Sequence, residues 1–243
     1  MTSNEMDDAP LRPTGRMERF NIIRNHLKFY NKLGVVANYT APLLTATLQA
    51  TIFTCLKEVL NHHPILGVTT LNEGSPEPTW TRLKSFDLRS VVKFVQPDVR
   101  GNDGWIQDAL RAPFEVVEDL PLWRVVIVPQ EAEGNDKTSF AVGFFCHHAI
   151  ADGVSAGAFQ LTFLDALNDL IDGKIGIEQT AVVQVPKLPL VPNIEMATPL
   201  PVGILYALKK VMNTYVYSSE DPRVWTGARI SAESPRPAIC NLK

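Results

Sequence analysis

The sequence predicts an α+β fold in which a mixed or antiparallel sheet is flanked by helices. Segments with apolar residues at helical spacing alternate with short runs rich in β-branched and aromatic residues, and two such runs adjoin one polar loop, as in a hairpin. Of the 243 residues, 45% are hydrophobic and 20% are charged, which excludes a disordered polymer and a small disulfide scaffold. The length suits one large domain, or one and a half, with a substantial apolar core.

The N-terminal part predicts a lead, two helices and a strand. Residues 1–16 contain prolines, a glycine and few apolar groups, so we expect a flexible lead. An amphipathic helix is expected over Met17–Tyr30 and a short strand over Val35–Tyr39. A longer helix is expected over Leu43–Leu60, where apolar residues recur near one face until Pro64.

The middle of the chain predicts most of the sheet. Three short runs separated by turn-forming residues predict strands at Ile65–Leu71, Trp80–Leu83 and Val91–Val95. A short helix over Trp105–Arg111 follows, and two apolar strands, Leu122–Val128 and Thr138–Cys146, flank the polar loop Glu131–Lys137. We expect this last pair to form an antiparallel hairpin.

The C-terminal part predicts one long helix and then a connector. Apolar spacing indicates a helix over Ser155–Ile171, and Gly173 stands where a left-handed cap is expected. Prolines crowd the remainder, interrupted mainly by a helical pattern at Val202–Tyr217. We therefore expect one domain over residues 17–180 and a proline-rich connector with one helix over residues 181–243.

Charge and cysteine usage exclude several classes of partner. Lys and Arg number 23 against 26 Asp and Glu, a net charge of -3 without a dense basic run, so nucleic acid is not an expected partner. The cysteines Cys55, Cys146 and Cys240 lack metal or redox spacing and are interpreted as free thiols in a reducing, cytoplasmic compartment. The polar, partly acidic start does not fit a secretory signal, and no apolar run approaches the ~20 residues that a bilayer span requires.

The residues best suited to chemistry stand between the last predicted strand and the long helix. His147, His148, Asp152 and Gly153 follow a very apolar strand, where side chains commonly face a cleft. A histidine titrates near neutrality, so His148 is a candidate general base for a hydroxyl proton. The alternative is a turn histidine held by backbone hydrogen bonds. Asp152 would orient the turn or the ring, and Gly153 would permit a bend or a close ligand approach.

Other candidates have simpler explanations. The pair His62 and His63 lacks nearby carboxylates or cysteines at ligand spacing, so we expect it to end a helix, with no metal site. Cys146 precedes the two histidines but would point to the opposite face of a strand from His147, as a core thiol rather than a nucleophile. The segment Val202–Tyr217, with Lys209 and Lys210, is compatible with peripheral membrane contact, although such segments more often pack on their own domain.

The run from His147 to Gly153 has the pattern HHxxxDG and resembles the superfamily of chloramphenicol acetyltransferase, plant BAHD acyltransferases, peptide-synthetase condensation domains and fungal alcohol acetyltransferases. The flanking segments Ala-Pro-Phe-Glu at 112–115 and Pro-Leu-Trp-Arg-Val at 121–125 also follow the order seen in that superfamily. Glu-Arg-Phe at 18–20, Asn-His at 25–26 and His-Pro-Ile-Leu-Gly at 63–67 look most like the alcohol acetyltransferase branch. Condensation domains usually place an arginine where this chain has Gly67.

The resemblance implies a chloramphenicol-acetyltransferase-like half-fold that transfers an acyl group from acyl-CoA, above all acetyl-CoA, to a small-molecule alcohol. His148 would be the base, His147 would support it, Asp152 would pair with an arginine that steadies the loop, and Gly153 would open the turn. No cofactor is bound permanently, and the resemblance assigns no CoA-binding residue in this chain. Fungal secondary metabolism is a plausible setting for such an activity.

Length departs from the superfamily pattern, because these enzymes are usually pseudo-dimers of two similar halves. This chain resembles the N-terminal half, and the stretch from Trp225 to Lys243 resembles the crossover toward the second. We therefore expect a complementing C-terminal half or self-association. Two alternatives remain open: a truncated, non-catalytic module that binds a ligand or partner, and an amide-forming condensation domain, which Gly67 disfavours.

Overall fold

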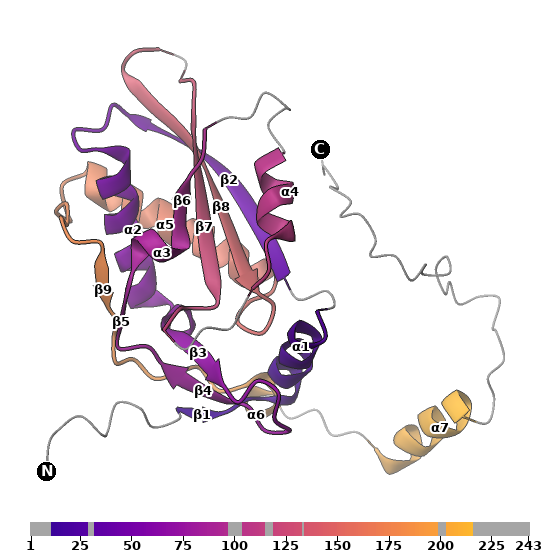
Figure 1. Cartoon of the computed structure of the whole chain (residues 1–243). Coiled ribbons are helices and arrows are strands. Elements are labelled where there is room, and N and C mark those ends of the chain that lie inside the picture. The colour runs from indigo at the N-terminus through magenta and orange to yellow at the C-terminus, as the bar shows by residue number, and fades with distance from the viewer. Residues whose placement is uncertain are drawn as a thin grey trace, which may run out of the picture. The chain divides into compact units, whose positions relative to one another are not determined.

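A four-stranded sheet with helices on both faces forms the centre of the computed structural model (Figure 1). The structure describes residues 11–28, 32–96, 104–114, 119–132, 134–198 and 203–215. The chain divides into two units, Met1–Asn193 and Ile194–Lys243, and the sheets belong to the first.

The strands are β1 (Arg12–Pro13), β2 (Lys32–Pro42), β3 (Val68–Leu71), β4 (Thr79–Arg82), β5 (Ser85–Asp87), β6 (Val92–Phe94), β7 (Trp123–Gln130), β8 (Lys137–His147) and β9 (Val182–Gln184). The helices are α1 (Arg16–His26), α2 (Leu48–His62), the 3₁₀ turn η1 (Pro64–Gly67), α3 (Leu88–Val91), α4 (Gly104–Arg111), α5 (Gly153–Ile171), α6 (Ile194–Ala197) and α7 (Ile204–Tyr215). Within these described ranges, no helix combines the length and the apolar character that a membrane span needs.

The main sheet has the strand order β2-β8-β7-β6 and is mixed. Strand β8 is antiparallel to both β2 and β7, so the expected hairpin is confirmed, while β6 is parallel to β7. A three-stranded sheet has the order β1-β4-β3, and β5 pairs with β9. Helices and mixed sheets together confirm the predicted α+β class.

Alternation along β8 creates two apolar layers. Phe144 and Cys146 point into the larger core, where α2 packs against α5 and α5 packs on the sheet. Phe145 points to the opposite face, where Trp105 of α4 packs edge-on against its ring. The sheet is therefore covered on both faces, and its central strand is almost completely buried.

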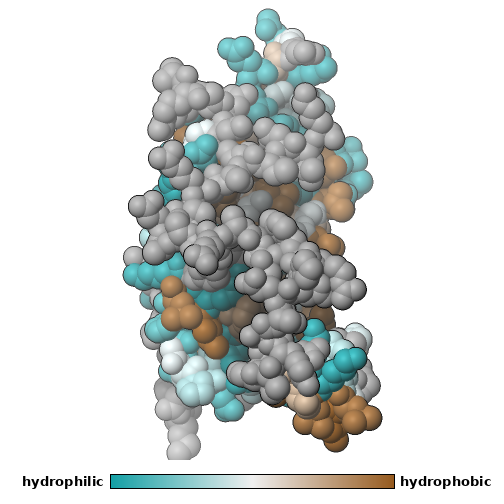
Figure 2. Space-filling view, turned by 90° about the vertical axis from the view of Figure 1, so that its right-hand side faces the viewer, coloured by the Kyte–Doolittle hydropathy of each residue, from teal (hydrophilic) through white to brown (hydrophobic). Residues whose placement is uncertain are grey.

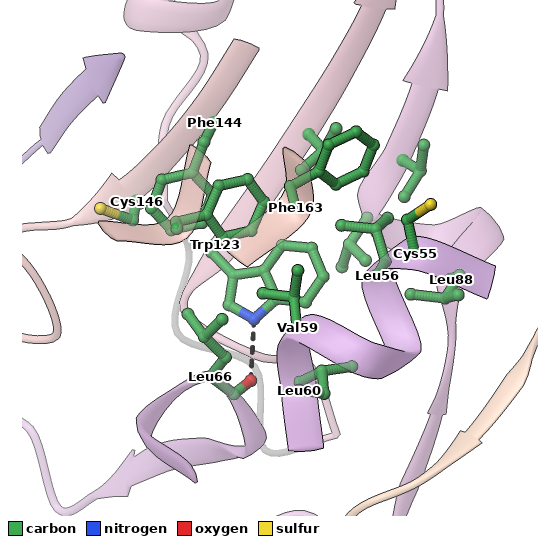
Figure 3. Close-up of a cluster of buried hydrophobic side chains, with 14 of the residues drawn as sticks. Cys55, Leu56, Val59, Leu60, Leu66, Leu88, Trp123, Phe144, Cys146 and Phe163 are labelled. Atoms are coloured by element: carbon green, nitrogen blue, oxygen red, sulfur yellow. Dashed lines mark hydrogen bonds between the residues drawn. The ribbon is translucent and has the colours of Figure 1, made fainter. Parts of the chain in front are cut away.

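Trp123 of β7 anchors the larger core (Figure 3). Its side chain lies among residues of α2, η1, β8 and α5, and its Nε1–H donates a 2.8 Å hydrogen bond to the carbonyl oxygen of Leu66. Trp123 is 1% exposed, and its indole N–H has a hydrogen-bond acceptor despite being buried. The rings of Phe144 and Phe159 stack nearby at 3.9 Å between centroids, which fixes α5 against β8.

Several boundaries differ from the sequence predictions. The first helix ends at His26, and its outward face is apolar, whereas Ile22 and Asn25 are its buried residues. Helix α2 begins at Leu48, because the Thr47 side chain accepts the Ala50 N–H and caps the helix there.

Two predicted segments contain structure of another type. The run expected as a strand from Ile65 begins with the 3₁₀ turn η1. Strand β9 lies inside the segment expected as a connector, and the first unit reaches Asn193 rather than residue 180. Part of the expected lead, Arg12–Pro13, pairs with β4 as β1, while residues 1–10 and the stretch from Trp225 to Lys243 lie outside the described residues.

Candidate active site

The turn from β8 into α5 carries all four candidate residues. His147 is the last residue of β8 and lies opposite Lys32 in the β2 register. Its N–H donates to the carbonyl oxygen of Leu122 at 2.9 Å, and its own carbonyl oxygen accepts the N–H of Ile150 at 3.1 Å. The backbone therefore turns sharply immediately after the buried strand.

His147 is a buried, neutral imidazole. The side chain is 1% exposed, and its Nδ1 accepts the backbone N–H of Ala149 at 2.9 Å. An accepting Nδ1 leaves the ring proton on Nε2. Burial, and secondarily the neighbouring His148, lowers the pKa of His147 to about 4. The ring therefore holds the turn in place without carrying charge near neutral pH.

His148 differs from its neighbour in accessibility. It is the first residue after β8 and is partly exposed, whereas His147 is closed off. Its Nδ1 atom is shielded from solvent. Of the two adjacent histidines, only His148 is not fully buried.

Asp152 caps the N-terminus of α5 by bonding to Ser155, whereas the resemblance implies that it pairs with an arginine. Its Oδ1 accepts the N–H of Ser155 at 2.8 Å and the hydroxyl of Ser155 at 2.7 Å. These backbone and side-chain hydrogen bonds lower the pKa of Asp152, so the cap is ionised. In the part of the chain that the structure describes, no arginine forms an ion pair with this carboxylate.

The packing around Gly67 leaves little space for a side chain at this position, where condensation domains usually have an arginine. A Cβ atom at Gly67 would lie 2.4 Å from Cγ1 of Val185, far inside contact distance. Val185 follows β9 and is itself buried, so this chain uses the volume beside Gly67 for packing. A larger side chain at Gly67 requires Val185 to move.

Gly153 is the first residue of α5, and its backbone is not in the left-handed conformation. Among the described glycines, only Gly134 and Gly173 adopt that conformation. A tight bend therefore does not explain this glycine. A Cβ atom built on Gly153 would meet nothing within 4 Å, so the start of α5 faces open space beside the turn. We therefore interpret Gly153 as a residue that leaves room for a ligand to approach the turn closely.

Two cations that the sequence reasoning missed brace the sheet face near His147. Lys32 Nζ donates to the carbonyl oxygens of Leu110 and Ala112 at 2.8 Å each, at the end of α4. Arg124 on β7 donates to the Ala112 carbonyl oxygen at 2.7 Å and lies 3.9 Å over the Phe114 ring. Burial, and secondarily Arg124, lowers the pKa of Lys32. Lys32 had no sequence signal beyond its place near a strand, and Arg124 was noted only as part of the flanking segment 121–125, without a role.

A buried glutamine joins α5 to two strands. Gln160 Nε2 donates to the carbonyl oxygens of Val35 on β2 and Val142 on β8, at 3.1 and 3.0 Å. Its Oε1 accepts the hydroxyl of Tyr39 at 2.7 Å. These bonds fix α5 relative to the strand that ends at His147. In the sequence, Gln160 is indistinguishable from a surface glutamine.

The remaining candidates have structural roles. His63 Nε2 lies 2.9 Å from the Thr162 hydroxyl, and burial lowers the pKa of His63, while His62 is exposed at the end of α2. Burial raises the pKa of Cys146 far above its ordinary value, as expected of a core thiol. Among the described residues, no three His, Cys, Asp or Glu side chains are grouped closely enough to hold a metal ion.

A family model for alcohol acetyltransferase matches residues 93–215, half of the chain, so the chain belongs to the alcohol acetyltransferase family. It is 25% identical to a probable alcohol acetyltransferase crmB from Aspergillus fumigatus, over 89% of this chain and 48% of that protein. It is also 25% identical to a probable alcohol acetyltransferase FCK4 from Fusarium pseudograminearum, over 65% of this chain and 34% of that protein. The chain spans at most about half the length of these curated relatives.

Solved structures support the fold. The first condensation domain of the calcium-dependent antibiotic synthetase superposes with a TM-score of 0.53 and 14% identity, covering 86% of this chain and 46% of that chain. The starter condensation domain of rhizomide synthetase RzmA gives a TM-score of 0.52 and 10% identity, covering 70% and 40%. These similarities confirm an acyltransferase-type half-fold. At such identities they carry no information on the substrate.

Proposed function

We propose that this chain is the N-terminal half of an alcohol O-acetyltransferase that uses acetyl-CoA and a small-molecule alcohol, with His148 as general base. The observation that carries the proposal is the accessibility contrast at the end of β8. One imidazole is buried and neutral, and the next is partly exposed beside the open start of α5. Membership of the alcohol acetyltransferase family supports the same assignment.

In this mechanism Nε2 of His148 takes the proton of the alcohol hydroxyl. The hydroxyl oxygen attacks the thioester carbonyl carbon of acetyl-CoA. The carbon–sulfur bond then breaks, and the CoA thiolate leaves and receives the proton from His148. The products are an acetyl ester and free CoA, and no acyl group is attached to the protein.

The other residues act on position rather than on the reacting atoms. His147 holds the turn through Ala149, and the Asp152 cap sets where α5 begins. Gly153 leaves the adjoining space open for a substrate. The half that the relatives possess in addition would supply further contacts to CoA, and a setting in secondary metabolism belongs to the same proposal.

Thiol release from acetyl-CoA with a panel of alcohols tests the assignment. The comparison is wild type against His148→Ala, with His62→Ala, an exposed histidine on α2, as the matched control. We expect His148→Ala to lower the alcohol-dependent rate at least ~100-fold, because general-base catalysis contributes ~10²–10⁴-fold. His62→Ala should leave the rate unchanged. Equal rates for wild type and His148→Ala would overturn the proposal.

A second candidate is a non-catalytic module that binds a ligand or partner. Binding of acetyl-CoA to the whole chain, measured by calorimetry, without any alcohol-dependent thiol release would support that candidate. Product formation with amine acceptors only would instead support the condensation alternative.

A further inference from the structure

Strand β2 forms one edge of the main sheet. The strand order is β2-β8-β7-β6, so in the part of the chain that the structure describes β2 is paired on one side only. The strand is long, with eleven residues from Lys32 to Pro42. Between these two ends it contains neither a charged residue nor a proline, which are the residues that commonly prevent edge strands from pairing. The edge is therefore suited to accept another strand.

The register shows which backbone groups of β2 face away from the sheet. The ladder with β8 continues past the end of β2, where the Leu43 N–H donates to the carbonyl oxygen of Asp136 at 2.7 Å. In an antiparallel pair every second residue bonds to the partner strand, so the odd-numbered residues of β2 bond to β8. The N–H and C=O groups of the even-numbered residues point outward, and three of these four residues are exposed. They are Gly34, Val36, Asn38 and Thr40.

Helix α5 lies over this edge strand. Gln160, near the middle of the helix, donates to the carbonyl oxygen of Val35 at 3.1 Å and accepts the hydroxyl of Tyr39 at 2.7 Å. The middle of α5 is therefore above the middle of β2. Helix α2 lies on the other side of α5, toward the opposite edge of the sheet, where the Phe53 ring is 6.5 Å from the Phe94 ring of β6.

The side of α5 that faces away from α2 is apolar and exposed. Leu161, Leu164 and Ile171 are 65%, 39% and 40% exposed. At about 100° per residue they lie on the opposite side of the helix from Thr162 and Ala166, which line a cavity against α2. We call these three residues the α5 stripe. Because α5 packs on β2, the stripe and the free edge of β2 lie on the same side of the domain.

We propose that two copies of this chain associate through β2, which pairs antiparallel with its counterpart across a two-fold axis. Such an axis is perpendicular to the joined sheet, so both α5 helices lie on one face and their stripes meet. Charge favours this arrangement. Lys32 is the one charged residue of β2, and antiparallel pairing places its two copies at opposite ends of the ladder, whereas parallel pairing would place them side by side.

Two features together define the surface. Hydrophobic residues reach the surface in several separate places on the side of the molecule drawn in Figure 2, so exposure alone does not identify an interface. The α5 stripe is distinguished by its position beside a free strand edge. Backbone pairing would supply direction and register, and burial of the stripe would supply apolar contact area.

Sedimentation equilibrium of the full chain over a range of concentrations tests the surface. The test variant is Leu161→Glu, and the matched control is Leu27→Glu, which alters an equally exposed leucine (68% against 65%) at the end of α1. We expect wild type and Leu27→Glu to dimerise. Leu161→Glu should raise the dimer dissociation constant at least about tenfold, because each copy loses a buried leucine. Added salt should not dissociate the dimer, since no ion pair holds it.

A second pair of variants tests the strand pairing. Asn38→Pro and Asn38→Ala both remove the bond between Asn38 and Gln130, but only proline also removes an outward N–H. Asn38→Pro should therefore weaken the dimer, and Asn38→Ala should not. In wild type, hydrogen exchange measured residue by residue should slow at the N–H groups of Val36 and Asn38 as the protein concentration rises.

Other results would overturn the proposal. A monomer at every concentration would do so, and so would a dimer that Leu27→Glu and Leu161→Glu weaken equally. Exchange at Val36 and Asn38 that is slow in the monomer would assign the edge to another segment of the same chain. Exchange that stays fast in the dimer would refute strand pairing, and this measurement needs no variant to fold. None of these results depends on acetyl transfer, so this proposal and the proposed function fail independently.

Discussion

The folded state should lose stability as pH falls from neutral, because it holds His147 uncharged. Burial lowers the pKa of His147 from its ordinary 6.5 to about 4. Between these values the unfolded chain binds a proton that the folded chain does not, so stability is complete above the unfolded pKa and is lost as pH falls toward the folded one. The buried Nδ1, which accepts the Ala149 N–H, is the atom that cannot be protonated without breaking the turn.

The magnitude follows from the size of the shift. One pKa unit corresponds to ~1.4 kcal/mol, so a displacement from 6.5 to about 4 amounts to about 3 kcal/mol in full. About 2 kcal/mol of this should be lost between about pH 7 and about pH 4.5. A domain of ordinary stability, ~5–15 kcal/mol, would register that change clearly.

Urea unfolding of wild type and His147→Asn across this pH range measures it. Asparagine Oδ1 can accept the Ala149 N–H in place of Nδ1 but does not titrate. Carboxylates and the partly buried His63 titrate in both proteins and cancel in the comparison. The stability advantage of wild type over His147→Asn should therefore shrink by about 2 kcal/mol on acidification. A constant difference, within ~0.5 kcal/mol, would refute the claim that His147 is buried and neutral.

Three further predictions concern the supports of the site. Gln160→Leu removes two buried hydrogen bonds and one part-buried hydrogen bond, and should cost about 3 kcal/mol in denaturant unfolding; a change below ~0.5 kcal/mol would contradict the network. Gly67→Ala should cost ~1–3 kcal/mol, and Val185→Ala should recover most of it in a double-mutant cycle, whereas additive effects would exclude the predicted clash. Asp152→Ala should cost about 1 kcal/mol and Asp152→Asn less, measured by thermal unfolding; equal losses would argue against a capping role.

Local sequence patterns predicted the secondary structure correctly where a segment is long and strongly periodic. The hairpin of β7 and β8 and the helix α5 match apolar spacing, and Gly173 ends α5 in the left-handed conformation with φ at +72°. The Gly173 and Lys174 N–H groups bond to Leu170 and Asp169 carbonyl oxygens, as this cap requires. Such features depend on contacts within a few residues, so the sequence specifies them directly.

Other features depended on partners far along the chain. Periodicity predicted an amphipathic helix over Met17–Tyr30 but did not say which way its apolar side faces. In the structure, the bonds of Glu18 and Asn25 turn that side outward. Strand β9 is short and lies among prolines, and only its pairing with β5 makes it a strand.

The sequence by itself determined that two adjacent imidazoles end an apolar strand, and residues 93–215 match the alcohol acetyltransferase family. Which imidazole is buried was decided by the tertiary structure. Pairing with β2, the Leu122 carbonyl and the Ala149 N–H together enclose His147 and leave His148 partly exposed. Burial is a property of everything that packs around a side chain. One of the neighbouring segments, β2, lies more than a hundred residues from His147 in the sequence, so no local pattern contains this burial.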